Sequence, residues 1–384
     1  MTWKEKIVHF FWTLLQKRRR RTRMEKMLSK RYNAAHHLLA KNPQPPLSDA
    51  DIREIDEFWG KYGIQFRDYS WYRWYYGLTG IHSPYFIGLD VYADIIMLHY
   101  NIHEFKNAWC DKGYFSSFLP GAPFPRVFFK KCNGRCYDAD GNYCREEELE
   151  AAFLRSVPDE EIILKQTHGK QGKGLQKLSL KNEADVRSAI QAIAQGSDLI
   201  VQEVVKQHPF FAQFNESSVN IIRINTLFLN GRVIVFDNAT LRYGLPGSIT
   251  DVNFVKGKEI VNAVPISADG SVLPVSFDTD GHKTDAAKLF DIKIDRVPNW
   301  DAVIETVKAY ALKIPYFAWI GWDVTVSADG NPVILEYNIK APGINFYQYR
   351  APLFGEYTEE VLRFLEDEET QERIVPPYLK KPKK

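Results

Sequence analysis

This chain of 384 residues has few cysteines, a small net charge and no long apolar run. It has four cysteines and a formal net charge of +2. Three of the cysteines, Cys132, Cys136 and Cys144, form a group, but they lack the paired C-x-x-C spacing that zinc sites prefer. We therefore expect reduced thiols in a cytosolic protein. The near-zero net charge gives no sign of a nucleic-acid partner.

The amino-terminal segment, residues 1–30, departs from this even charge. Its apolar run from Ile7 to Leu15 is far shorter than the ~20 residues of a membrane-spanning helix. The arginines of "KRRRRTRMEK" follow the run, whereas a secretory signal places its charge first. Aromatic residues beside a basic cluster suit a helix on an anionic membrane surface, here the inner face of the plasma membrane. A solvated basic helix or a partner-binding arm fits the same pattern.

In the rest of the chain, the predicted secondary structure changes from helices to mainly strands. Residues 31–119 show helical patterns, including "SDADIREIDEFWGKYG", where Ser48 is the expected N-cap and Gly63 the end. Short β-rich runs and turn signals follow over 120–205 and 206–357, with helices expected at 183–195 and 300–312. A polar helix and a basic tail complete the chain over 358–384. This order predicts an α+β protein with two β-rich lobes behind a helical region.

The stretch "GWDVTVSADGNPVILEYN" predicts a β-hairpin with acids on one face. With Asp329-Gly330 as a two-residue loop, counting outward places Asp323 opposite Glu336 and Asn338 diagonal to Asp323. Opposed carboxylates about 4.5–5.5 Å apart at Cβ repel unless something positive lies between them. A magnesium ion is the economical solution; two acids on a solvent-exposed face are the alternative. The other face is the expected core and comprises Trp322, Val324, Val326, Val333, Leu335 and Tyr337.

A glycine-rich loop lies in "IILKQTHGKQGKGLQKLSL", between two predicted strands. Gly169, Gly172 and Gly174 free the backbone to approach a ligand, while Lys173 adds charge and Lys165 ends the first strand. A Walker A loop would carry Ser or Thr and enter a helix, and the Rossmann glycine pattern is absent. We therefore expect a flap over nucleotide phosphates, with a plain surface turn as the alternative.

Two further strands carry polar groups. In "DLIVQEVV", Gln202 and Glu203 interrupt a buried strand and could face an adenine and a ribose, although an ordinary strand end explains them as well. A hairpin turning at Asn230-Gly231 places Arg223 opposite Asn238 and Asn225 opposite Phe236. Arginine offers a rigid fork for phosphate or carboxylate, and Arg242 follows in "LRYGLPGSITDVNF".

Taken together, these pieces resemble the ATP-grasp superfamily, which includes D-alanine–D-alanine ligase and glutathione synthetase. The step of thirteen residues from Asp323 to Glu336 and the Glu-x-Asn that follows look like its magnesium-binding pattern. More specifically, "VQEVVKQHPFFAQFNESSVNIIRINTLF" and "ATLRYGLPGSITDVN" are similar to the sugar-transfer-associated ATP-grasp proteins of bacterial polysaccharide clusters. The likeness extends from about Pro84 to Ala351.

The resemblance implies a set of site residues. ATP would contact Lys165, the glycine flap, Gln202 and Glu203, with either Lys130 or Lys131 as a second nucleotide lysine. Magnesium would be held by Asp323, Glu336 and Asn338. Arg223 and Arg242 would stabilise the transferring phosphate or orient an acid substrate. His208 could act as a base or contact the substrate, or it could be a structural histidine.

The activity implied is that of an ATP-dependent ligase acting in cell-surface glycan synthesis. A carboxylate would be activated as an acylphosphate and then coupled to an amine, with small-molecule or glycan acids and amines as substrates. Such chemistry needs positioning and charge neutralisation rather than a side-chain nucleophile. A kinase of a sugar or lipid-linked glycan and a non-catalytic nucleotide-binding scaffold are the alternatives.

Overall fold

The computed structural model describes residues 26, 29–158, 161–169, 174–255, 258–286, 295–340 and 343–380. The chain divides into two compact units, Met1–His99 with Gln348–Lys384, and Tyr100–Tyr347. The finer division predicted from the sequence, with boundaries at 119/120 and 357/358 among others, stays a prediction. Most of the predicted membrane-surface segment lies outside the described residues. Within the described part, no helix is long and apolar enough to cross a membrane.

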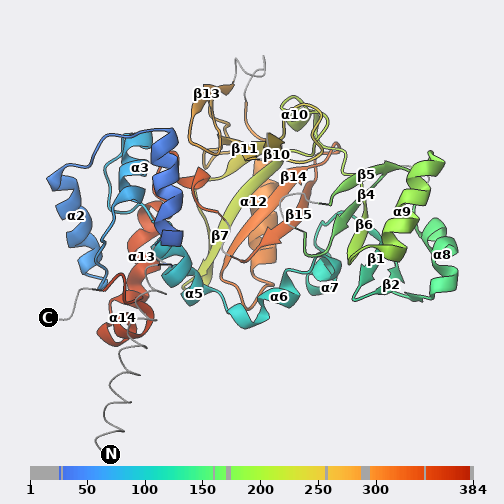
Figure 1. Ribbon diagram of the computed structural model, residues 1–384, viewed down its shortest axis with the longest axis horizontal. Helices are drawn as coiled ribbons and strands as arrows, with labels where there is room; N and C mark the ends of the chain where they lie inside the picture. The colour runs from blue at the N-terminus through green and yellow to red at the C-terminus, as the bar shows by residue number, and fades with distance from the viewer. Residues whose placement is uncertain are drawn as a thin grey trace, which may run out of the picture. The chain divides into compact units, whose positions relative to one another are not determined.

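The first unit is helical (Figure 1), and its core is strongly aromatic. Ser48 caps α2 as predicted, because its Oγ accepts a bond of 3.1 Å from the amide of Asp51, although the helix ends at Gly60 rather than Gly63. Its elements are 29–41, α2 (Asp49–Gly60), α3 (Ser70–Thr79), α4 (Leu89–Val91), the π-helical η1 (Tyr92–Ile96), α5 (Met97–Tyr100), η6 (Gly355–Tyr357), α13 (Thr358–Leu362), η7 (Arg363–Leu365) and α14 (Glu368–Ile374).

Buried carboxylates tie this unit together. Arg31 Nε donates to Asp94 over 2.9 Å, and the hydroxyl of Tyr378 donates to the same carboxylate. The hydroxyl of Tyr32 donates to Asp90, which is fully buried. Buried acids persist when such partners satisfy them, so the carboxyl-terminal segment is fixed to the helical unit by polar as well as apolar contacts.

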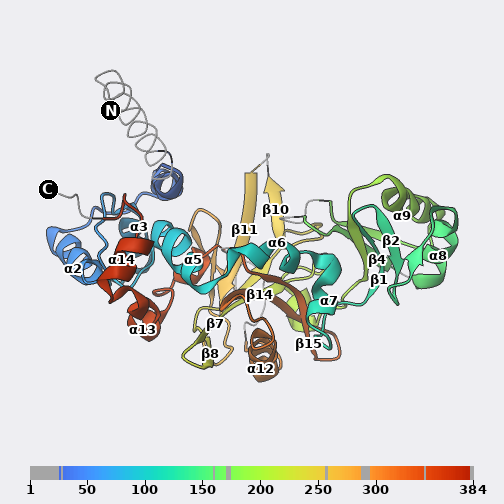
Figure 2. The same ribbon diagram turned by 90° about the horizontal axis from the view of Figure 1, so that it is seen from below.

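In the second unit, a six-stranded antiparallel sheet has the order β3-β2-β1-β6-β4-β5. Helices α8 (Leu149–Ser156) and α9 (Glu183–Gln195) cover one face (Figure 2), and α9 confirms the helix predicted at 183–195. The strands are β1 (Val127–Cys132), β2 (Arg135–Asp138), β3 (Tyr143–Cys144), β4 (Glu161–Gln166), β5 (Gln176–Ser179) and β6 (Leu199–Glu203).

A nine-stranded sheet forms the rest of this unit, with the main order β13-β12-β11-β9-β7-β14-β15; β10 pairs with β11 and β8 with β7. Helix α12 (Trp300–Ala311) packs its apolar side on one face, so the other face is free to carry polar groups (Figure 2). The strands are β7 (Ile221–Leu229), β8 (Arg232–Val235), β9 (Thr240–Tyr243), β10 (Val252–Val255), β11 (Lys258–Pro265), β12 (Val275–Phe277), β13 (Lys283–Asp285), β14 (Trp319–Val326) and β15 (Pro332–Asn338).

Short helices of residues 103–118 precede the first strand and contact both sheets. Lys130 of β1 donates from Nζ to the carbonyl of Gly113 over 3.2 Å, and the ring of Phe115 stacks on that of Tyr337 in β15 at 4.3 Å. The elements are η2 (His103–Phe105), α6 (Lys106–Trp109), η3 (Lys112–Tyr114) and α7 (Phe115–Phe118); α10 (Pro209–Ala212), η4 (Glu146–Glu148) and η5 (Phe346–Gln348) lie elsewhere in the chain.

The hairpin of β14 and β15 departs from the predicted register at two places, and the two departures cancel. The amide of Ser327 donates to the carbonyl of Asn331, so the loop holds three residues rather than two, with Gly330 at φ +87°. A bulge between Asp323 and Val324 then restores the predicted pairing of Asp323 with Glu336. The predicted core face was therefore wrong in part. Ile334 replaces Val333 and Leu335 in the core, because both of these turn to the other face.

The hairpin turning at Asn230-Gly231 follows the prediction only at first. Asn225 lies opposite Phe236, as the backbone bond between them shows. Beyond that point the chain leaves β8, and Arg223 pairs with Thr240 of β9 instead of Asn238. The partner of Arg223 is thus two residues further along the chain than predicted. Because side chains alternate between the faces of a strand, Arg223 and its partner still project to the same face of the sheet.

Candidate active site

An ion pair stands at the centre of the polar face of the large sheet. Asp323 on β14 pairs across the sheet with Arg223 on one side and Glu336 on the other. Arg223 donates from Nη2 to Asp323 Oδ2 over 2.7 Å, and its Nε contacts the second oxygen. Burial raises the pKa of Asp323 to about 7, against the opposing effect of this guanidinium.

A lysine from outside the two sheets neutralises the second acid. Lys112 Nζ lies 3.1 Å from Glu336 Oε2, with side chains 15% and 29% exposed. Burial would raise the pKa of Glu336, but Lys112, Lys165 and Arg223 together lower it to about 2. Each of the two acids thus has a protein cation as its partner, Arg223 for Asp323 and Lys112 for Glu336, and the magnesium ion predicted between them stays a prediction.

The three predicted metal ligands nevertheless lie together. Asn338 Nδ2 donates to Asp323 Oδ2 over 3.1 Å, and Glu336, two residues before Asn338 on β15, pairs directly with Asp323. Two carboxylates and an amide oxygen are the ligand types that magnesium takes in proteins, usually with waters and substrate phosphates. The set fits such an ion. Among the residues that the structure describes, no group of three or more His, Cys, Asp or Glu side chains could hold a metal by itself.

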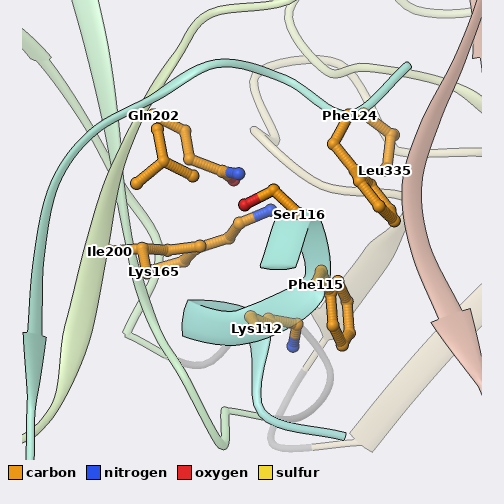
Figure 3. A pocket seen from close by; sticks show the side chains of 9 residues that line it. Lys112, Phe115, Ser116, Phe124, Lys165, Ile200, Gln202 and Leu335 are labelled. Atoms are coloured by element: carbon orange, nitrogen blue, oxygen red, sulfur yellow. The ribbon is translucent and has the colours of Figure 1, made fainter. Parts of the chain in front are cut away.

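A pocket lies between the two sheets beside these acids (Figure 3). The side chain of Lys165 from β4 reaches into it, near Ser116, and Lys112 lines it from below in the view. Burial and the proximity of Lys112 lower the pKa of Lys165 to about 8, although Glu336 opposes them. Two lysines therefore approach the same acid from different elements.

The rest of the pocket lining is apolar with one amide. Phe124 and Leu335 lie across the pocket from Lys165, whereas Ile200 and Gln202 lie on the same side as Lys165 (Figure 3). Gln202 is buried and donates from Nε2 to the carbonyl of Pro125 over 3.3 Å. Its neighbour Glu203 does not line the pocket, because its exposed side chain accepts a bond from the amide of Arg126.

The two candidate lysines of β1 separate onto opposite faces. Lys131 is buried and donates to the carbonyls of Ile193, Ala194 and Gly196 at the end of α9, at 2.8–3.0 Å. It therefore neutralises the helix C-terminus. Lys130 projects to the face opposite the helices. It pairs with Ile200 of β6, which pairs in turn with Lys165 of β4, so the three residues form one row across the sheet.

The glycine loop is described only at its ends. Gly169 accepts a bond from Lys112 Nζ over 2.9 Å through its carbonyl. Gly174 has φ +74°, a conformation that favours glycine. Gly172 and Lys173 lie outside the described residues, so their predicted contact with phosphates stays a prediction.

A second arginine pair lies on the same sheet face. Arg242 Nη2 is 2.9 Å from Asp251 Oδ2, with both side chains mostly buried. Thr240 and Thr325 add buried hydroxyls that make no hydrogen bond within the described part of the chain. Buried polar groups normally have partners, so this face has unused capacity to bind a polar ligand.

His208, by contrast, has a structural role. Its Nδ1 accepts a bond of 3.1 Å from the amide of Phe210, which makes it the N-cap of α10, and its own amide donates to Val326. Val326 is the last residue of β14, three residues along the strand from Asp323. These contacts do not bring His208 to the acids or lysines of the pocket.

Lys112 is the residue that sequence reasoning missed. It lies in the region 31–119, for which the sequence predicts helices, and "CDKGYF" carries no repeat of charge or glycine that marks a site. Asp111, whose Oδ1 accepts from the amide of Gly113, fixes the turn that presents Lys112. Its importance follows from tertiary contacts with Glu336 and Gly169, which no local pattern reveals.

A family model described as sugar-transfer associated ATP-grasp matches residues 120–359. The chain belongs to this family. The match confirms the predicted resemblance and the α+β ATP-grasp fold behind a helical region. No curated protein matches the chain.

Solved structures of similar proteins include three ATP-grasp or synthetase enzymes. The ligase PsnB, in complex with a minimal precursor, is 15% identical, with 69% of this chain and 63% of PsnB covered and a TM-score of 0.39. D-cycloserine synthetase DcsG is 14% identical, with 69% of this chain and 73% of DcsG covered and a TM-score of 0.38. N5-carboxyaminoimidazole ribonucleotide synthetase, in its ADP complex, is 16% identical, with 72% of this chain and 54% of the synthetase covered and a TM-score of 0.36. The chain thus spans less than two thirds of PsnB.

Proposed function

We propose that this member of the family is an ATP-dependent carboxylate–amine ligase that uses magnesium. The observation that carries the proposal is the convergence of Lys112, Lys165 and Arg223 on Glu336 and Asp323, at a pocket between two sheets. Four of these five residues come from four different strands, and the fifth from a separate segment. Such a cluster suits a highly charged substrate held by positioning and electrostatics.

Each group has a role in binding ATP. Lys112 and Lys165 would contact the phosphates, while Gln202, Phe124 and Leu335 would enclose the adenine. The apolar and amide surfaces suit an aromatic base, and the two lysines suit anionic oxygens. Lys131 is engaged at α9 and has no part in this assignment.

The metal site completes the nucleotide site. Asp323, Glu336 and Asn338 would hold a magnesium ion, which when bound neutralises phosphate charge. Lys112 at 3.1 Å from Glu336 would then be released toward the phosphates. Arg223 remains beside Asp323 and presents its charge to the transferring group.

The chemistry requires two displacements. A carboxylate oxygen of the acid substrate attacks the γ-phosphorus, and the bond to ADP breaks. The amine nitrogen then attacks the acyl carbon, phosphate leaves, and the nitrogen loses a proton. Arg223 stabilises charge on the transferring phosphoryl group, and Arg242 with the hydroxyl of Thr240 orients the acid.

The family description favours substrates related to glycan synthesis. We therefore propose a role in building a cell-surface polysaccharide, in the cytoplasm, with the acid or the amine carried by a sugar. The basic segment of residues 17–26 would hold the protein at the anionic inner face of the plasma membrane. A sugar kinase would require a base beside the accepting hydroxyl, and the predicted candidate, His208, is occupied as a helix cap.

Trapping with hydroxylamine tests the proposal. The protein is incubated with MgATP, pools of amino acids and acidic sugars, and hydroxylamine, which converts an acylphosphate into a hydroxamate. Hydroxamate and ADP are expected in equal amounts, and chelation of magnesium or Glu336→Gln should abolish both. Glu161→Gln, at an exposed acid of β4, is the matched control. Phosphorylated sugar without hydroxamate would replace the ligase by a kinase, and intact nucleotide binding without turnover would indicate a scaffold.

A further inference from the structure

The face of the six-stranded sheet opposite α8 and α9 carries a row of aromatic and cationic side chains. Tyr143 of β3 pairs with Tyr137 of β2, which pairs in turn with Lys130 of β1. Directly paired residues project to the same face, and the rings of Tyr137 and Tyr143 are 6.2 Å apart. The neighbouring pair, Cys136 and Cys144, points into the core on the helix side.

Two more residues extend this row. Lys130 Nζ lies 4.9 Å from the ring of Tyr114 in η3 and 5.8 Å from that of Tyr137. Arg135 is two residues before Tyr137 on β2, so it projects to the same face. We call Tyr114, Lys130, Arg135, Tyr137 and Tyr143 the tyrosine platform.

The platform is open to a ligand. Tyr143 is 61% exposed and Tyr114 is 38% exposed, although large aromatic side chains normally bury most of their surface. The row continues toward the nucleotide pocket, because Lys130 pairs with Ile200 and Ile200 with Lys165. A molecule bound on the platform would therefore extend toward the reacting groups.

We propose that the tyrosine platform is a subsite for a carboxylate-bearing pyranose ring of an acidic glycan. The C–H faces of a pyranose are apolar and stack on tyrosine rings, whose hydroxyls can bond with the sugar hydroxyls. The carboxylate pairs with Lys130 and Arg135, and charge-assisted bonds of this kind are among the strongest. Binding to the platform does not depend on the ligase activity, but the view that the bound sugar belongs to a substrate rests on the proposed function.

The charge balance supports an anionic occupant. The platform supplies two cations, and two carboxylates close to it, Asp111 and Asp198, are already engaged. Asp111 Oδ1 accepts from the amide of Gly113 over 2.9 Å, and its Oδ2 lies 3.4 Å from His168. The two oxygens of Asp198 accept from the amides of Asn133 and Gly134. A neutral sugar would stack on the rings but leave both cations without a counter-charge.

Calorimetry with defined oligosaccharides tests the proposal on the full chain. Hexagalacturonate is titrated into the protein with and without MgADP, and maltohexaose serves as the neutral probe. We expect the acidic probe to bind in both states, with affinity that falls as salt rises. Tyr143→Ala and Arg135→Ala should each weaken binding at least tenfold, while Tyr143→Phe should retain it within about threefold.

Matched controls lie on the same lobe. Leu154→Ala removes an exposed apolar side chain from α8, and Arg187→Ala removes an exposed cation from α9; both helices lie on the other side of the sheet. Neither should alter binding. Thermal unfolding and the affinity for MgADP should stay unchanged in Tyr143→Ala and Arg135→Ala, which separates loss of the subsite from loss of the fold.

Three results would overturn the proposal: no binding of hexagalacturonate, equal binding of maltohexaose, or unchanged binding by Tyr143→Ala. Binding of anionic phosphatidylglycerol vesicles through the same residues, without sugar binding, would assign the platform to a membrane instead. If hexagalacturonate binds as expected but no hydroxamate forms in the ligase assay, the subsite stands and the proposed reaction fails.

Discussion

Replacing Lys112 by methionine separates two effects that the structure combines in one side chain. The substitution keeps the length and apolar stem of lysine but removes the charge that lies 3.1 Å from Glu336 and 2.9 Å from the carbonyl of Gly169. If Lys112 serves the nucleotide phosphates, ATP should bind more weakly. If it also competes with the metal for Glu336, magnesium should bind no more weakly in the absence of nucleotide.

The magnitude follows from the contacts. At 3.1 Å and an effective dielectric constant of about 20, the gross attraction between Lys112 and Glu336 is about 5 kcal/mol. Desolvation cancels much of this, and a hydrogen bond to a charged group contributes about 1.5–3 kcal/mol net. Transferred to a phosphate contact, that range predicts a loss of roughly 10- to 150-fold in ATP affinity. Stability should fall too, by up to about 1.5–3 kcal/mol, because Glu336 and the carbonyl of Gly169 lose their charged donor; the relieved repulsion with Lys165 offsets only part of this loss.

Titration calorimetry with MgATP and with magnesium alone measures both effects, and chemical denaturation measures stability. Lys177→Met, which removes an exposed lysine that pairs with Glu161 on the same lobe, is the control. An ATP affinity within threefold of the unsubstituted protein would refute the phosphate role. Weaker binding of magnesium alone would refute the idea that Lys112 competes with the ion.

Three other predictions concern separate parts of the unit. Lys131→Met should lower the free energy of unfolding by about 1.5–3 kcal/mol, because three carbonyls at the end of α9 lose a charged donor. The affinity for MgATP should not change. Denaturation measures the first effect and calorimetry the second, so the two assays together distinguish a structural role of Lys131 from a nucleotide-binding one. Burial lowers the pKa of Lys165 to about 8, so nucleotide affinity should fall as the pH rises through 8 and Lys165 loses its charge. Nucleotide binding near pH 8 should therefore be accompanied by proton uptake, and this uptake should be absent in Lys165→Met. Calorimetry in buffers of different ionisation enthalpy measures it. Gly330→Ala should destabilise the protein by about 1 kcal/mol or more, because φ is +87° and the new Cβ would lie 2.8 Å from Asn299 Nδ2; an unchanged melting temperature would contradict this account of the loop.

Local signals in the sequence predicted the elements that carry the acids. A turn with Asp-Gly and the alternation of apolar residues were enough to pair Asp323 with Glu336. The pairing was right although the loop length was wrong, because the bulge beside Asp323 compensated for the extra loop residue. Hairpin counting has no means of finding a bulge, so Leu335 was assigned to the core although it lines the pocket.

Groups whose roles depend on distant contacts could not be assigned from sequence. The adjacent Lys130 and Lys131 looked equivalent, and their separation depends on which face of β1 meets α9. Lys112 gave no signal at all, since it meets Glu336 across more than two hundred residues. His208 was a fair candidate by residue type, but the backbone of α10 occupies its ring nitrogen.

Segment 103–118 has a practical consequence for how this protein is cut. A fragment restricted to the family match, residues 120–359, would begin after Lys112 and Phe115 and so would lack a cleft cation and the ring that stacks on Tyr337. It would also retain residues 348–359 without the helices to which they belong. Conserved-domain boundaries and the smallest active piece are therefore different things in this chain, and an inactive fragment of that kind would say nothing about the whole protein.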